Sequence, residues 1–128
     1  MKLLLDTHAV IWSMDDPAKL SRLAVEAIEN ESNERLISIG TVWELSIKVQ
    51  LGKLTLARPF REWIDDAFIF LCASLLPVTL DDAEDQHRLP LHHRDPFDRM
   101  LAAQANTGDL TIVSVDQVFD LYGVRRLW

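Results

Sequence analysis

The chain has 128 residues, of which 48% are hydrophobic and 26% are charged, as in an ordinary soluble globular protein. We expect a single domain over residues 1–128, because this length is enough to bury one core. No apolar run has the length of a membrane helix. The formal net charge of −7 argues against binding of nucleic acid by overall charge, so local basic groups would have to make such contacts.

A short hydrophobic strand that ends in an acid opens the chain. Leu3, Leu4 and Leu5 suit a strand covered on both faces, as in a parallel sheet, and Asp6 and Thr7 follow directly. Ligands of open parallel sheets bind just beyond the carboxyl ends of the strands, so Asp6 stands where a site is expected. Asp is also a preferred N-cap, and capping of the following helix is the alternative role for Asp6.

Helical and strand patterns alternate along the middle of the chain. Helices are expected over residues 8–12, 21–28, 41–51, 60–71 and 79–86, and strands over residues 36–39 and 75–78. Thr41 and Glu44 have the spacing of a capping box, although a glutamate in the first helical turn also points back toward the strand ends. The single cysteine, Cys72, lies in an apolar helical stretch and is expected to be a buried thiol. It cannot form an intrachain disulfide, which is compatible with a cytoplasmic location.

The most informative stretch runs from His92 to Ala105. Asp95 and Pro96 predict the start of a helix, because Asp caps and proline suits the first helical position. Asp98 then takes the third position, where a negative charge stabilises the helix dipole. A strand over residues 110–114 leads to Asp116, a second acid just past a strand, and residues 123–128 are expected to add an edge strand. Strands that alternate with helices predict an α/β fold with a mostly parallel sheet.

Four acids share a placement, although each has a capping or dipole explanation of its own. Asp6 and Asp116 follow strands, and Glu44 and Asp98 lie in the first turns of helices. All four can converge at the same edge of a parallel sheet. Carboxylates brought together raise one another's pKa unless a cation lies among them, and oxygen ligands select a hard ion such as Mg²⁺ or Mn²⁺.

At these residues the chain resembles the PIN-domain ribonucleases, and within them the VapC-type toxins of prokaryotic toxin–antitoxin modules. The likeness spans essentially the whole chain and rests on residues 3–8, 38–44, 93–105 and 114–116. It implies a three-layer α/β/α sandwich with a central, mostly parallel sheet. It also implies that four acids are the catalytic and metal-binding residues, namely Asp6, Glu44, Asp98 and Asp116. Thr7 and Ser114 are expected to orient these carboxylates, and Asp95 is expected to cap its helix.

The resemblance further implies the activity. The implied activity is that of a Mg²⁺-dependent endoribonuclease, with Mn²⁺ as a substitute, that would leave a 5′-phosphate and a 3′-hydroxyl. A cognate antitoxin would neutralise it, and the family also implies a homodimer; the apolar faces around Trp43 and Trp63 are compatible with both. Contacts to RNA phosphates, with ordinary surface charge as the alternative for each, are expected from five basic residues: Lys48, His92, His93, Arg94 and Arg99.

Two other classes of protein stay open on sequence grounds. A receiver domain also gathers acids at strand ends, but it needs adjacent early acids and a late lysine, which this chain does not show. A catalytically silent binding module fits if the acids only cap helices. Zinc hydrolysis has little support, because His92, His93 and the single cysteine lack the spacing of zinc ligands.

Overall fold

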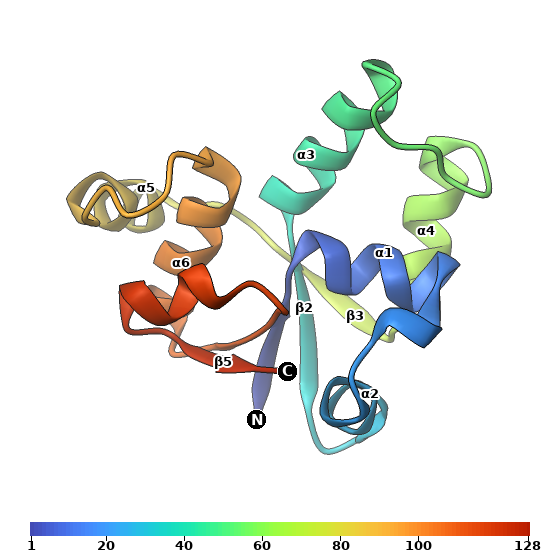
Figure 1. Cartoon of the computed structure of the whole chain (residues 1–128), viewed down its shortest axis with the longest axis horizontal. Coiled ribbons are helices and arrows are strands. Elements are labelled where there is room, and N and C mark those ends of the chain that lie inside the picture. The colour runs from blue at the N-terminus through green and yellow to red at the C-terminus, as the bar shows by residue number, and fades with distance from the viewer.

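A parallel sheet of five strands forms the middle layer of the computed structural model, which describes all of residues 1–128 (Figure 1). The strand order is β3-β2-β1-β4-β5, and every neighbouring pair is parallel. The strands are β1 (Lys2–Leu5), β2 (Glu34–Ser38), β3 (Ala73–Leu76), β4 (Thr111–Val113) and β5 (Arg125–Leu127). Because all strands point the same way, their carboxyl ends meet at one edge of the sheet.

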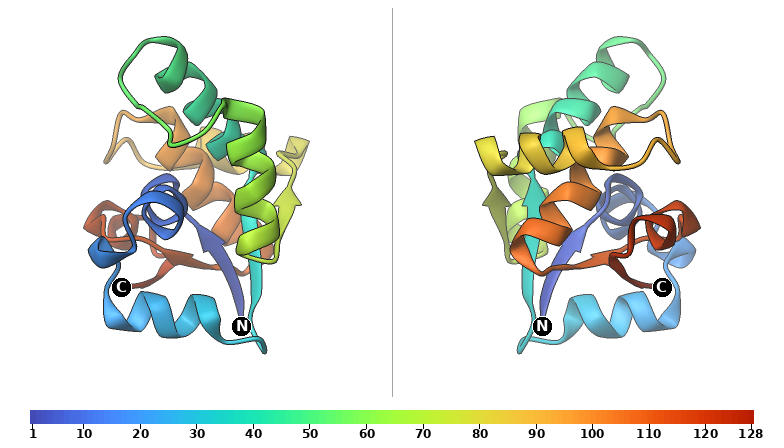
Figure 2. Two further views of the ribbon diagram at one scale, coloured as in Figure 1. Left: turned by 90° about the vertical axis from the view of Figure 1, so that its right-hand side faces the viewer. Right: turned by 90° about the vertical axis from the view of Figure 1, so that its left-hand side faces the viewer.

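Helices cover both faces of this sheet. They are α1 (Thr7–Asp15), α2 (Arg22–Glu29), α3 (Ile39–Gln50), α4 (Phe60–Phe70), α5 (Leu80–Arg88) and α6 (Pro96–Gly108), with short 3₁₀ helices at Pro17–Lys19 and Gln117–Tyr122. Figure 1 shows α1 to α4 on one side of the sheet and α5 and α6 on the other. In the views of Figure 2, α3 and α2 lie at opposite ends of the molecule. The expected three-layer α/β/α fold is therefore confirmed, with a sheet that is parallel throughout.

The leucines of β1 explain why the sheet is sandwiched. Leu3, Leu4 and Leu5 are each 0% exposed. Leu3 and Leu5 belong to the core under α1 to α4, whereas Leu4 belongs to the core under α6. Successive side chains of a strand point to opposite faces, so three leucines in a row bury both faces at once.

Most of the predicted helix starts are present. Ser21 accepts a hydrogen bond from the Ala24 amide, Thr79 and Asp82 form a reciprocal capping box, and the Asp95 side chain caps α6. Strand β5 lies at an edge of the sheet, as expected for residues 123–128, and β3 forms the other edge. Strand β3 ends before Pro77, which has no N–H to donate to a neighbouring strand.

The predicted capping box of Thr41 and Glu44 is wrong. Helix α3 begins two residues earlier, and its N-cap is Ser38, whose side chain accepts a hydrogen bond from the Gly40 amide at 3.0 Å. Thr41 therefore lies inside the helix. The consequence is that Glu44 is free of any capping role and available to other partners.

The expectation for Cys72 is also wrong. Helix α4 ends at Phe70, and Cys72 takes a left-handed conformation with φ of 47° where the chain turns directly into β3. This turn leaves the Cys72 side chain exposed.

The two tryptophans on predicted apolar faces have different environments. Trp63 is only 2% exposed, and its indole N–H donates to Asp15, so this face of α4 packs in the core. Trp43 is 63% exposed. None of the helices combines the length and hydrophobicity that a membrane span requires.

Candidate functional site

A cavity of about 270 Å³ opens at the carboxyl edge of the sheet. Its lining consists of Asp6, Thr7, His8, Trp12, Glu44, Lys48, Asp95, Asp98, Val115 and Asp116. All four predicted acids thus face one hollow, although they come from separate parts of the chain. The cavity also takes in His8 and Trp12, which were not among the predicted site residues; the position of His8 two residues after Asp6 was the available signal.

Asp6 and Asp116 each cap a helix and also line the cavity. The Asp6 carboxylate accepts a hydrogen bond from the Ala9 amide at 2.7 Å, and the Asp116 carboxylate accepts one from the Val118 amide at 3.0 Å. A carboxylate has two oxygens and several acceptor positions, so a cap does not remove either acid from the cavity. Capping by Asp6 and Asp116 therefore does not exclude a second role for either acid in the cavity.

Ser114 connects these two acids. Its hydroxyl oxygen accepts a hydrogen bond from the Asp116 amide at 2.9 Å, and its side chain lies close enough to Asp6 to lower the pKa of that carboxyl group. Burial raises the pKa of Asp6, although the hydrogen bonds from Ser114 and Ala9 oppose this shift. Ser114 is itself fully buried, at 0% exposure, so it holds the ends of β1 and β4 in a common arrangement.

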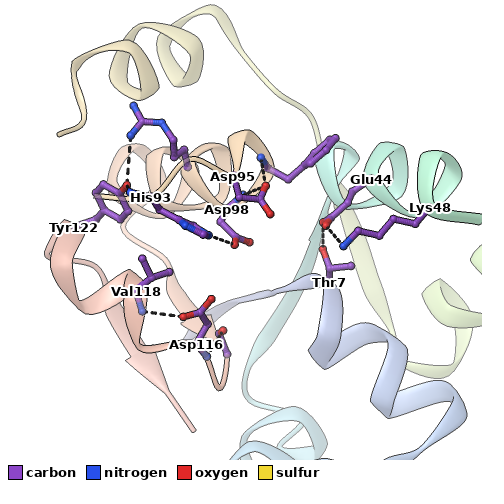
Figure 3. A network of polar contacts seen from close by, with 12 residues as sticks. Thr7, Glu44, Lys48, His93, Asp95, Asp98, Asp116, Val118 and Tyr122 are labelled. Atoms are coloured by element: carbon purple, nitrogen blue, oxygen red, sulfur yellow. Dashed lines mark hydrogen bonds and ion pairs between the residues drawn. The ribbon is translucent and has the colours of Figure 1, made fainter. Parts of the chain in front are cut away.

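Glu44 is buried and both of its oxygens have partners. The Thr7 hydroxyl donates to Oε1 at 2.5 Å, and Lys48 Nζ lies 2.6 Å from Oε2 (Figure 3). Burial alone would lower the pKa of Lys48, but the hydrogen bond to Glu44 and its charge outweigh this and raise it. Lys48 is therefore a fixed cation at the rim of the acidic cavity.

Asp98 occupies the most crowded electrostatic position. Burial first, and then the charges of Asp95 and Glu44, raise its pKa to about 6, although the hydrogen bond to His93 opposes this shift. The distance from His93 Nε2 to Asp98 Oδ2 is 2.9 Å. A carboxyl pKa raised this far indicates that the positive groups around Asp98 do not compensate the negative charge of the neighbouring acids.

Three side chains come close enough to share an ion. His93, Asp98 and Asp116 each offer one ligand atom, and these atoms all lie within 4.8 Å of one another. Figure 3 shows this group on one side of the site and Glu44 with Thr7 and Lys48 on the other. His93 was predicted as a contact for RNA, and its place among the acids was missed. Its position in the loop just before Asp98 was the signal.

The other basic residues that were expected to contact RNA have different settings. Lys48 lines the cavity, and Arg94 is exposed. His92 is exposed too, and its ring packs against that of Tyr122 with centroids 5.4 Å apart.

Arg99 does not face the cavity, contrary to the expectation of an RNA contact. It is only 5% exposed, and its guanidinium donates to the carbonyl oxygens of Gln86, Leu89 and Pro90 and to Tyr122 Oη. The last carbonyl groups of a helix have no partner within that helix. Arg99 donates hydrogen bonds to carbonyl oxygens at the end of α5, and the need of these oxygens for donors explains why Arg99 is buried.

A comparison with known families identifies the fold. The model of the PIN domain family matches residues 3–124. This chain belongs to the PIN domain family. The resemblance noted in the sequence is thereby confirmed at the level of the family. No sequence among curated proteins matches this PIN domain.

Solved structures that resemble this chain include VapBC toxin–antitoxin proteins and a VapC toxin. VapBC2 from Rickettsia felis, bound to a DNA fragment from its promoter, has 15% identity and a TM-score of 0.74 over 98% of this chain and 97% of that one. DNA-bound VapBC from Salmonella typhimurium has 20% identity and a TM-score of 0.71 over 98% and 96%. VapC20 from Mycobacterium tuberculosis, described as a toxin that cleaves the sarcin-ricin loop, has 17% identity and a TM-score of 0.61 over 95% of each chain. At these identities the likeness is one of fold.

Proposed function

We propose that this PIN domain is a metal-dependent endoribonuclease that acts as the toxin of a toxin–antitoxin module. The observation that carries the proposal is the shared cavity at the carboxyl edge of the sheet, into which Asp6, Glu44, Asp98 and Asp116 all converge. Helix capping alone requires each acid to meet its own backbone amides, but it gives no reason for four acids to meet one another.

The donor set fits a hard divalent cation. Burial and neighbouring carboxylates raise the pKa of Asp98 to about 6, which is the state that a cation would relieve. In this proposal Asp98 and Asp116 bind the ion directly, and Asp6 and Glu44 add negative charge around it. Carboxylate oxygens suit Mg²⁺ or Mn²⁺. When bound, the ion would lower the pKa of a water molecule and stabilise charge on the scissile phosphate.

The remaining cavity residues would prepare the site for a phosphodiester. Thr7 and Ser114 orient Glu44 and Asp6 through the hydrogen bonds described above. Lys48 brings a positive charge to the rim of an otherwise acidic hollow, where it is placed to contact an RNA phosphate. Exposed His92 and Arg94 are further candidates for phosphate contacts.

RNA and an antitoxin are the proposed partners. The description of VapC20 as a toxin that cleaves the sarcin-ricin loop supports RNA as the class of substrate. The VapBC structures support a cognate antitoxin, and we also propose a cytoplasmic location and a homodimer. An open reading frame for a small DNA-binding protein next to the gene is the expected genetic companion.

Cleavage of RNA tests the proposal directly. We expect the wild-type chain to cut an end-labelled RNA with Mg²⁺ and to stop when EDTA is added. Asp116→Asn removes one ligand and is expected to lower the rate by about 10²-fold or more. Asp109→Asn is the matched control, because Asp109 is exposed, lies outside the cavity and has a left-handed φ of 53° that asparagine also tolerates.

The control is expected to cut RNA at the wild-type rate. Cleavage that survives EDTA, or an Asp116→Asn variant as active as Asp109→Asn, would overturn the metal-dependent mechanism. An inactive wild-type chain that still binds its antitoxin would instead favour a silent binding module.

Binding of the ion is expected to stabilise the folded state. A ligand that binds only the folded chain raises stability by RT ln(1 + [L]/Kd), about 1.4 kcal/mol at ten times Kd. This corresponds to a rise in Tm of about 5 °C for a domain of this size. Differential scanning calorimetry with EDTA and with saturating Mg²⁺ measures it. Identical melting curves in both conditions would mean that the acids serve as caps only.

A further inference from the structure

His93 is the residue whose position the proposed nuclease does not yet explain. It lies in the loop between α5 and α6, and its imidazole Nε2 is 2.9 Å from Asp98 Oδ2. It shares with Asp98 and Asp116 the cluster of ligand atoms within 4.8 Å (Figure 3). The other acids of the cavity are not part of this cluster.

A buried network of hydrogen bonds holds the loop that carries His93. The His93 backbone N–H donates to Tyr122 Oη at 2.9 Å, and Arg99 donates to the same hydroxyl oxygen at 3.3 Å and to the Pro90 carbonyl at 2.8 Å. Arg99 is 5% exposed and Tyr122 is 8% exposed. A side chain positioned by a buried second layer is typical of a preorganised site.

We propose that His93 supplies a nitrogen ligand to the ion that Asp98 and Asp116 hold. The inference rests on the proposed metal-dependent function and refines it. Ligand atoms around one six-coordinate ion lie roughly 3–4 Å apart, given bonds of about 2.0–2.2 Å. The observed spread of up to 4.8 Å therefore needs only a small contraction. An ion between His93 and Asp98 would replace the hydrogen bond that now joins them.

A nitrogen ligand changes which ion the site prefers. Mn²⁺ suits oxygen ligands as Mg²⁺ does, but as a first-row transition-metal ion it accepts an imidazole nitrogen more readily than Mg²⁺. We therefore expect Mn²⁺ to bind more tightly than Mg²⁺. Replacement of His93 with glutamine, whose amide keeps a polar group there, should lower the Mn²⁺ affinity by roughly tenfold or more and the Mg²⁺ affinity by clearly less.

The other histidines provide matched controls. His8 also lines the cavity, but its ring packs on Trp12 with centroids 5.2 Å apart. His92 is the neighbour of His93, and its ring packs on Tyr122. Neither belongs to the cluster of close ligand atoms. His8→Gln and His92→Gln should therefore leave the nitrogen ligand in place.

Pulsed EPR of the Mn²⁺-loaded chain tests the inference without relying on activity. A coordinated imidazole gives ¹⁴N modulation of the Mn²⁺ echo, which we expect in the wild type, His8→Gln and His92→Gln, and not in His93→Gln. Circular dichroism and thermal melting check that each variant is folded.

The outcomes separate this inference from the proposed function. Bound Mn²⁺ without ¹⁴N modulation in the wild type, or modulation that persists in His93→Gln, overturns the nitrogen ligand and leaves an all-oxygen nuclease site standing. Modulation lost in His8→Gln instead assigns the ligand to His8 and overturns the role of His93. A wild-type chain that binds no Mn²⁺, by titration followed in the same spectrometer, overturns both proposals.

Discussion

Replacement of Asp98 with asparagine is expected to abolish RNA cleavage and, at the same time, to stabilise the metal-free protein. Asparagine keeps the shape of the side chain but removes the charge that would hold the ion. We expect a loss in cleavage rate of about 10²–10³-fold or more, which corresponds to the loss of several kcal/mol of stabilisation of the transition state. A labelled RNA with saturating Mg²⁺ measures this part of the prediction.

The gain in stability follows from the pKa of Asp98. Burial raises this pKa from 3.8 to about 6, so the folded chain binds the proton more tightly than the unfolded chain does. The stabilisation is therefore fully present below pH 3.8 and is lost as the pH rises to about 6. Above pH 6 the ionised group costs up to about 3 kcal/mol. Part of this cost is screened by solvent, so Asp98→Asn is expected to raise the free energy of unfolding by about 1–2 kcal/mol at pH 7.5.

Urea denaturation in EDTA at pH 7.5 and at pH 4.5 measures this effect. The gain should shrink at the lower pH, where Asp98 in the folded wild type is already protonated. Asp109→Asn removes the same charge from an exposed position and should give no comparable gain. A destabilised Asp98→Asn variant, or one that cuts RNA like the wild type, would contradict the assignment of Asp98 as an uncompensated metal ligand.

Substitution of Arg99 with lysine is expected to be the most destabilising conservative change near the site. The planar guanidinium of Arg99 donates to three carbonyl oxygens and to Tyr122 Oη from a buried position. A single ammonium group cannot reach all of these acceptors, and buried acceptors without a donor are costly. We expect a loss of about 2–4 kcal/mol in the free energy of unfolding.

The exposed neighbour Arg94 offers the control for this change. Arg94→Lys should alter stability by less than about 0.5 kcal/mol, as is usual for surface substitutions. Chemical denaturation of the two variants side by side makes the comparison. If Arg99→Lys were as stable as the wild type but bound RNA more weakly, the residue would be an RNA contact after all, and its structural role would be wrong.

Interactions within a few residues explain which features the amino-acid order predicted correctly. Leu3–Leu5 bury both faces of β1 because side chains alternate along any strand. Ser21 and Asp95 start helices because an N-cap needs only a side-chain oxygen and an amide two or three residues further on. Asp6 and Asp116 reach the same edge because parallel strands share the direction of their ends.

Contacts between distant segments decided the remaining features. Glu44 meets Thr7 across 37 positions of the chain, a contact that exists only once α1 and α3 lie side by side. Arg99 is buried because α5 ends beside α6 with carbonyl groups to satisfy. Hydrophobic periodicity records which face of an element is covered, but it carries no information about the polar groups that the neighbouring element presents. Those groups exist as partners only after the layers have packed.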